Sequence, residues 1–301
     1  MAENGVQGVG ISVRADDPEL RDLPGNLDWA ERLGVDSVEL PTLAMDLIAG
    51  VRIMRERVRR LKSTIEGRPF RYTVHGPIGI NLMDRAWRRP LHEEVLAASI
   101  EIAAELGADH YVVHSGLMGV VPGPVIEDAY LHQREALHRA GDLAAKLGVI
   151  VCVENIFSPD IKDHTALPSR LAREITAIGH PSVKACLDFS HGFIWSTRHS
   201  VDYLSEAAAL APFAKHLHVH DSFGRPEEIQ TFSRAEKLAF GQGDLHLPVG
   251  WGAIPWDRLI ETLQFHPGVV FNIELDQRYR SEGAEVVAAV RALARRARVA
   301  A

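Results

Sequence analysis

The sequence predicts a single (β/α)8 barrel that spans residues 1–301. Short apolar runs of strand character alternate with longer helical segments about eight times, and the chain has the length of such a barrel. The alternative, a doubly wound open sheet, needs a glycine-rich phosphate turn after its first strand, and GVGISV lacks the rest of that fingerprint. No linker or shift in composition divides the chain, so we expect one domain.

The expected strands are short runs bounded by turn residues, at 8–13, 35–40, 71–74, 110–113, 149–153, 183–187, 214–217 and 269–273. The expected helices show apolar residues at helical spacing, at 26–33, 46–65, 93–106, 127–147, 169–178, 201–210, 256–265 and 284–299. Gly34, Gly107 and Gly148 stand where helices end. A long loop, 221–252, follows strand seven. Loops of this length are usually functional, and we expect a substrate lid with Phe223, Phe232 and Phe240 turned inward. The alternative is a short surface helix, which the segment SRAEKLA can form.

Composition places the chain among ordinary globular proteins, with 46% hydrophobic and 24% charged residues. The formal charge of -7 argues against non-specific nucleic-acid binding, although a DNA enzyme with a local basic groove is not excluded. Cys152 and Cys186 lie in apolar runs and are expected to be buried thiols. The start of the chain lacks a signal peptide, and no apolar run is long enough to span a bilayer, so we expect a cytoplasmic protein with no membrane partner.

Six consecutive predicted strands run into residues that bind metals well. These residues are His75, His114, Glu154, Asp188, His218 and Glu274. His191 follows Asp188 by three positions, and the long loop adds Asp244 and His246. Because the C-terminal ends of barrel strands converge on one mouth, these side chains should surround a common centre. Nitrogen and oxygen donors without sulfur suit Zn, Mn, Co or Fe(II). The donors exceed what one cation can use. Either several metals bind, or one binds and the surplus groups contact substrate.

Two of the carboxylates are candidates for proton transfer. Glu154 and Glu274 belong to strands three apart in the barrel and could flank a substrate, so that one removes a proton and the other returns it. In a site with two or three metals, the same carboxylates would bridge cations that activate a water.

The motifs VENI, LDFSHG, HLHVHDS and NIELD resemble the xylose isomerase-like superfamily of TIM barrels, and the resemblance covers nearly the whole chain. That superfamily holds sugar isomerases and epimerases, inosose dehydratases and endonuclease IV. In the epimerase branch, a quartet binds one Mn or Co ion and its two Glu exchange a proton. The resemblance carries this quartet over to Glu154, Asp188, His218 and Glu274. In the endonuclease IV branch, nine residues hold three zinc ions, which corresponds here to His75, His114, Glu154, Asp188, His191, His218, Asp244, His246 and Glu274.

The segment DLHLPVGWG is similar to the Asp-x-His and Gly-x-Gly turn of the endonuclease branch, but the front half departs from it. The chain lacks that branch's Asn/Arg/Trp loop after strand two, and Ile78 stands where an aromatic would follow the first His ligand. We therefore predict a metal-dependent isomerase or epimerase of a small sugar, keto-sugar or polyol. The alternative is a multinuclear zinc phosphodiesterase of the endonuclease IV kind. A barrel that only binds a sugar or a metal is a third interpretation, and a homo-oligomer remains open.

Four further residues are predicted to contact substrate. Glu39 ends strand two in GVDSVEL, which looks like the sugar enzymes, where such a Glu faces substrate. Trp195 and Trp251 could stack on a sugar face, although core packing explains them equally well. Arg85 lies in the loop after strand three and could hold a phosphate, against the alternative of a solvated basic turn.

Overall fold

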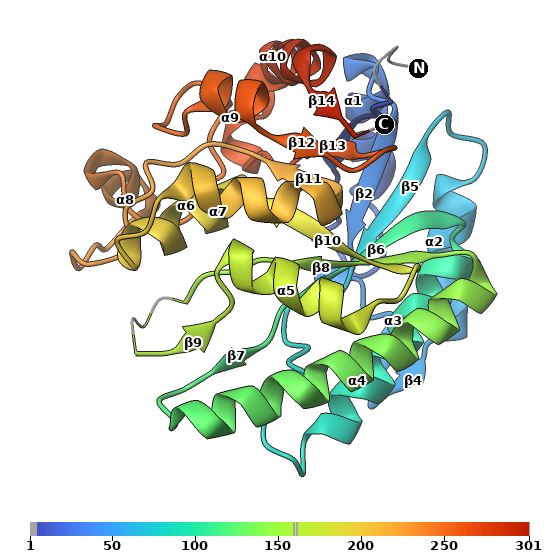
Figure 1. Cartoon of the computed structure of the whole chain (residues 1–301). Helices are drawn as coiled ribbons and strands as arrows, with labels where there is room; N and C mark the ends of the chain where they lie inside the picture. The colour runs from blue at the N-terminus through green and yellow to red at the C-terminus, as the bar shows by residue number, and fades with distance from the viewer. Residues whose placement is uncertain (1–4, 159, 161, 301) are drawn as a thin grey trace.

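The computed structural model describes residues 5–158, 160 and 162–300 and shows a closed parallel barrel of eight strands ringed by helices (Figure 1). The strands of the barrel are β1 (Gly8–Ser12), β2 (Ser37–Pro41), β5 (Arg71–His75), β6 (Ala108–His114), β8 (Ile150–Glu154), β10 (Val183–Asp188), β11 (Ala214–Val219) and β13 (Val270–Ile273). Each strand pairs with the next barrel strand along the chain, and β1 pairs with both β2 and β13. The predicted fold class is confirmed.

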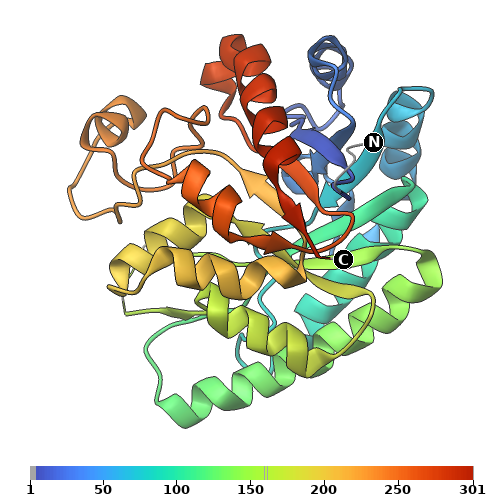
Figure 2. The same ribbon diagram turned by 45° about the horizontal axis from the view of Figure 1, so that its top comes forward.

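The helices lie outside the barrel (Figures 1 and 2). They are α1 (Leu23–Leu33), α2 (Arg55–Ile65), α3 (Arg89–Glu105), α4 (Gly123–Leu147), α5 (Pro168–Ile178), α6 (Phe189–Arg198), α7 (Tyr203–Leu210), α8 (Arg234–Phe240), α9 (Trp256–Thr262) and α10 (Gly283–Arg296). Gly34 and Gly148 take left-handed backbone angles just past α1 and α4, as their positions predict. Among the described helices, none combines the length and the apolar character needed to cross a membrane.

Short elements complete the chain. They are the 3-10 helices η1 (Thr42–Ala44), η2 (Ala211–Phe213) and η3 (Gln277–Glu282), and the strand pairs β3 (Ile48–Ala49) with β4 (Arg52–Ile53), β7 (Leu117–Met118) with β9 (His164–Thr165), and β12 (Gln264–Phe265) with β14 (Arg298–Val299). The predicted helix 46–65 is wrong in its first half, where β3 and β4 form a hairpin. Gly50 and Val51 both have positive φ in the hairpin turn, and a right-handed helix cannot pass through two such residues.

The apolar core lies mainly between the barrel wall and the helices. In α2, for example, Val58, Leu61 and Ile65 follow helical spacing and are buried against the wall, while the other faces carry charges. The inside of the barrel is instead largely polar towards its mouth, where side chains such as Glu39 and His216 are fully buried. Cys152 and Cys186 are buried free thiols, as expected.

Two segments differ from the prediction near the mouth. Residues 189–198 form the unpredicted helix α6, which Asp188 caps by accepting a hydrogen bond of 2.7 Å from the backbone N–H of His191. The long loop 221–252 contains α8, which stands apart from the barrel in Figures 1 and 2. Phe232 is 82% exposed and Phe240 is 46% exposed, so these rings do not turn inward as a lid would require.

Candidate metal centre and cavity

The fold brings all nine predicted ligands to the C-terminal mouth of the barrel. His75, His114, Glu154 and Asp188 are the last residues of β5, β6, β8 and β10. The others come from β11, from the residue after β13, from the first turn of α6 and from the segment between α8 and α9; they are His218, Glu274, His191, Asp244 and His246. Their donor atoms fall into three groups.

The first group surrounds Oε2 of Glu154. Nε2 of His75 lies 3.2 Å from this oxygen, and Nε2 of His114 lies 3.5 Å from it. Nδ1 of His75 is 2.9 Å from the carbonyl oxygen of Gly76, to which it can donate. That hydrogen bond would leave the Nε2 lone pair of His75 directed at the group, which is how backbone carbonyls orient metal-binding imidazoles.

The second group surrounds Nδ1 of His218. The carboxylate oxygens of Glu154, Glu274 and Asp188 lie 3.3, 3.6 and 3.7 Å from this nitrogen. The nitrogen is buried and makes no hydrogen bond of good geometry with any described residue. Donor atoms around a tetrahedral ion with bonds of about 2.0–2.1 Å are separated by about 3.3 Å, so these spacings suit a cation among the four side chains.

The third group surrounds Oδ2 of Asp244. Nε2 of His191 lies 3.3 Å away, and Nε2 of His246 lies 2.6 Å away. Nδ1 of His246 is 2.9 Å from the carbonyl oxygen of Glu274, which again fixes the ring by its far nitrogen. His246 has a left-handed φ of 46°, a strained conformation for a residue other than glycine.

One histidine of the centre is absent from the predicted set. Nε2 of His220 lies 3.0 Å from Asp188, and its Nδ1 lies 3.6 Å from Asp244. Its ring stacks on that of His246 with centroids 4.0 Å apart. His220 therefore links the second and third groups. Side-chain alternation along a strand places residues 216, 218 and 220 on one side, and this pattern is the sequence feature that could have predicted His220 as part of the centre.

The charges in the centre compensate one another. Burial alone would raise the pKa of Glu154, but the neighbouring His218 and His114 hold that pKa well below its usual value. Burial would lower the pKa of His75, but contact with Glu154 raises it to about 9. Asp244 likewise overcomes burial and raises the pKa of His246 to about 9. Glu154 is therefore ionised at neutral pH, and a metal ion would displace protons from these two histidines.

The residues fit divalent metal ions. The centre combines imidazole and carboxylate donors, the unpartnered Nδ1 of His218 and spacings suited to a cation. His75, His114 and Glu154 would hold one ion. By their pair distances, the quartet Glu154, Asp188, His218 and Glu274 would hold a second, and His191, Asp244 and His246 a third.

Glu39 does not lie where a substrate contact was predicted. Its side chain is fully buried inside the barrel, below the mouth, and is not part of the cavity wall. Its Oε2 lies 3.0 Å from Nε2 of His216 and 3.3 Å from Nε2 of His218, and its Oε1 accepts a hydrogen bond of 2.8 Å from Ser12. Glu39 lies two residues before the end of β2, so it is too deep in the barrel to reach the mouth. It is instead a hydrogen-bonding partner of the candidate ligand His218.

The other three predicted substrate contacts also lie outside the cavity. Trp195 is buried in α6, and its Nε1 donates to the carbonyl of Thr165 at 3.4 Å, so it packs in the core. Trp251 is half-exposed and rests against Tyr279, with ring centroids 5.4 Å apart. Arg85 is exposed and does not line the cavity, which agrees with a solvated turn.

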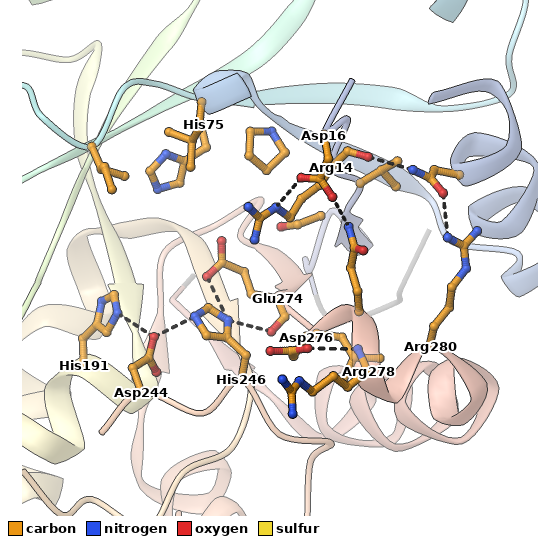
Figure 3. A pocket seen from close by; sticks show the side chains of 18 of the residues that line it. Arg14, Asp16, His75, His191, Asp244, His246, Glu274, Asp276, Arg278 and Arg280 are labelled. Carbon is orange, nitrogen blue, oxygen red and sulfur yellow. Dashed lines mark hydrogen bonds and ion pairs between the residues drawn. The ribbon is translucent and has the colours of Figure 1, made fainter. Parts of the chain in front are cut away.

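A cavity of about 710 Å³ opens above the three groups, within the ~300–1,000 Å³ typical of small-molecule sites (Figure 3). Seven of the predicted ligands line it: His75, His114, Glu154, His191, Asp244, His246 and Glu274. Trp29, Leu43 and Ile78 give it an apolar wall. Arginines that the sequence did not single out also line it, namely Arg14, Arg234, Arg278 and Arg280.

Solved structures share this fold at low identity. A D-tagatose 3-epimerase-like protein is 18% identical, with a TM-score of 0.71 over 95% of this chain and 98% of that one. D-psicose 3-epimerase from Clostridium cellulolyticum, solved with D-tagatose, is 14% identical, with a TM-score of 0.66 over 95% and 99%. A Thermus thermophilus protein soaked with zinc chloride is 22% identical, with a TM-score of 0.62 over 95% and 97%.

No curated protein gives a significant match to the chain. The family model described as a xylose isomerase-like TIM barrel matches residues 27–296, which include all nine ligands and every barrel strand after β1. By its sequence, its closed barrel and its buried His, Glu and Asp cluster, the chain belongs to the xylose isomerase-like TIM barrel family.

Proposed function

We propose that the protein is a divalent-metal-dependent isomerase or epimerase that acts on a small sugar, keto-sugar or polyol. The observation that carries the proposal is the arrangement of Glu154 and Glu274. They come from strands three positions apart in the barrel, both lie near Nδ1 of His218 and both line the cavity. The solved relatives named as ketose epimerases support the same class of reaction.

In this proposal Glu154, Asp188, His218 and Glu274 hold the ion used in the reaction. A bound divalent ion supplies Lewis-acid polarisation of a carbonyl and hydroxyl pair. One glutamate removes the proton from the carbon next to the carbonyl, and the other returns a proton to it. Both glutamates line the cavity, which supports these roles, and Leu43 and Ile78 line it with apolar side chains next to which the reacting carbon would lie.

Proton exchange on ketoses tests the proposal. Metal-loaded protein would be incubated with a panel of ketopentoses and ketohexoses in D2O, and deuterium at the carbon next to the carbonyl followed by NMR. We expect incorporation for at least one ketose, and a loss of about 10²–10⁴-fold in Glu154→Gln and in Glu274→Gln. Metal content would be measured in each variant, so that loss of the ion is separated from loss of the acid–base group. Full turnover by both variants would contradict the proposed roles.

A second candidate, a multinuclear zinc hydrolase of phosphodiesters, is favoured by one specific observation. Glu154 offers Oε2 to the first group and Oε1 to the second, which is how a carboxylate bridges two ions in hydrolytic centres. The zinc-soaked Thermus protein supports the choice of metal. Zinc-loaded protein would be assayed on bis(4-nitrophenyl) phosphate and on an abasic duplex. Cleavage of the first without the second would exclude the DNA version, and cleavage of neither would exclude this candidate.

A further inference from the structure

The cavity has a second end, away from the third ligand group, that is lined by arginines. Arg14 comes from the loop after β1, and Arg278 and Arg280 come from η3. Figure 3 shows them on the opposite side of the cavity from His191 and Asp244. A molecule lying in the cavity can therefore reach both ends.

Arg280 is a partly buried cation that lacks a carboxylate partner among the described residues. Its guanidinium donates to Oδ1 of Asn26 at 2.6 Å and to the carbonyl of Gly25 at 3.3 Å, which are neutral acceptors. It also lies over the ring of Trp29, 4.6 Å from the ring centroid. Burial, with the nearby charge of Arg32, lowers its pKa, as expected for a cation without a counter-charge. These contacts hold the guanidinium in place at the cavity wall while leaving its positive charge unpaired.

Arg278 is exposed, and within the described ranges its guanidinium forms no ion pair. The contrast is Arg234 on the same cavity wall, which is bound to Asp276 at 2.6 Å and to the carbonyl of Leu245 at 2.6 Å. The carboxylate nearest to Arg14 is Asp16, at 3.7 Å. Among the described residues that line the cavity, Arg278 and Arg280 are thus the two arginines whose guanidinium groups have no carboxylate partner.

This concentration of positive charge runs against the rest of the chain, which carries a formal charge of -7. A neutral sugar needs hydroxyl-binding groups and gains little from an unpaired guanidinium. A planar guanidinium with several N–H donors matches the oxygens of a phosphate or a carboxylate. The arginine end is therefore suited to an anion.

We propose that the substrate carries a terminal anionic group, a phosphate or a carboxylate, which Arg278 and Arg280 bind while the opposite part of the same molecule reaches the metal ligands. The identity of the reacting part rests on the proposed function. The anionic group rests on the arginines alone.

Isothermal titration calorimetry on metal-loaded protein tests this, with D-fructose, D-fructose 6-phosphate and D-fructuronate as probes. We expect the phosphate or the uronate to bind at least about tenfold more tightly than D-fructose, because a charge-assisted pair of hydrogen bonds stabilises the complex by that much or more. The tighter of the two identifies the group. Arg278→Gln and Arg280→Gln should each weaken that probe about tenfold and should weaken D-fructose, which carries no charge, far less.

Arg85→Gln is the matched control, because Arg85 is exposed, lies outside the cavity and should not affect any probe. Arg280 donates to Asn26 and Gly25 of α1, so its variant would be checked by thermal unfolding. Arg278 lacks such side-chain contacts among the described residues and gives the decisive comparison. Equal affinities for the three probes, no binding of any, or an advantage of the anion that survives in Arg278→Gln would overturn the proposal. A tight anion without deuterium exchange would count against the isomerase instead, since the two measurements are independent.

Discussion

Oε2 of Glu39 and Nε2 of His218 lie 3.3 Å apart inside the barrel, where both side chains are fully buried. Nδ1 on the other side of the same ring faces Glu154, Asp188 and Glu274. A carboxylate that accepts from Nε2–H holds the imidazole in the tautomer whose Nδ1 lone pair is free. Through this hydrogen bond, Glu39 orients His218 so that its Nδ1 faces the three carboxylates of the centre.

Glu39→Gln should weaken metal binding by about 10–100-fold, the usual cost of losing such a partner. Oε1 of Glu39 accepts from Ser12 while Oε2 faces two imidazoles, so one end of a glutamine would be mismatched. Zinc affinity would be measured by competition with a chelator, alongside Glu66→Gln, an exposed glutamate, as control. An unchanged affinity in Glu39→Gln would show that Glu39 serves only the packing of the barrel.

The three donor groups predict a metal count. Protein loaded with excess zinc and then freed of unbound metal should hold about three ions per chain. Asp244→Asn should remove about one of them, because Asp244 is the centre of the third group and contacts neither His75 nor His114. Elemental analysis gives both numbers. A count of about one that Asp244→Asn does not change would assign the third group to substrate binding.

Acid should destabilise the fold through His110, which is buried 3.3 Å from His216, Nδ1 to Nδ1. Burial, with the nearby His216, lowers the pKa of His110 well below its usual value. Below the ordinary histidine pKa of about 6.5, the unfolded chain takes up a proton here and the folded chain does not, so stability falls as pH falls.

Urea unfolding at several pH values between about 7 and about 5 measures this effect, with at most about 1.4 kcal/mol lost per pH unit from one such group. His110→Gln should show a shallower dependence than the natural protein. His132→Gln, which changes an exposed histidine, should keep the original slope. Equal slopes in all three proteins would mean that His110 does not carry the effect.

Outside the centre, Glu174 is a buried carboxylate whose loss should destabilise the protein strongly. It lies 2.6 Å from Nε of Arg134 and 2.7 Å from Nε of Arg170, and it joins α5 to α4. Glu174→Gln removes a buried negative charge that faces both guanidinium groups and leaves Arg134 without a carboxylate partner among the described residues, while Arg170 keeps Glu127 at 2.8 Å. We expect a loss of about 2–3 kcal/mol in the free energy of unfolding. The exposed pair of Glu56 and Arg59 supplies the control, and Glu56→Gln should change stability far less.

The barrel and the positions of the candidate ligands could be predicted from the sequence because both follow from strand periodicity. Each strand places its last inward residue at the mouth of the barrel. A histidine or an acid at the end of an apolar run, such as Glu154 after VCV, is therefore predicted to lie at the mouth. The ends of helices could also be predicted where a glycine follows them, as at Gly148.

The sequence did not predict how deep in the barrel each inward side chain lies. Glu39 and Glu154 both point inward, but only the packing of the whole barrel decides that Glu154 lines the cavity and Glu39 does not. The hairpin of β3 and β4 was missed because the basic segment around it has helical spacing, and two residues with positive φ overrode that pattern. Arg280 gave no signal because its place in the cavity depends on Trp29 and Asn26, far away in sequence.

Strand β11 presents His216 and His218 inside the barrel, with His220 directly after it. Successive inward residues are about 6.6 Å apart along a strand, so the three histidines lie at three depths. His216 lies in the barrel interior, His218 lies among the candidate ligands, and His220 lies nearest to the mouth. Deleting a single residue before His216 would exchange all three for Leu217, Val219 and their neighbours. Leu217 and Val219 now pack in the apolar core, so the three histidines would take their places there and the centre would lose His218. In this protein the register of β11 alone decides whether the centre contains its histidines.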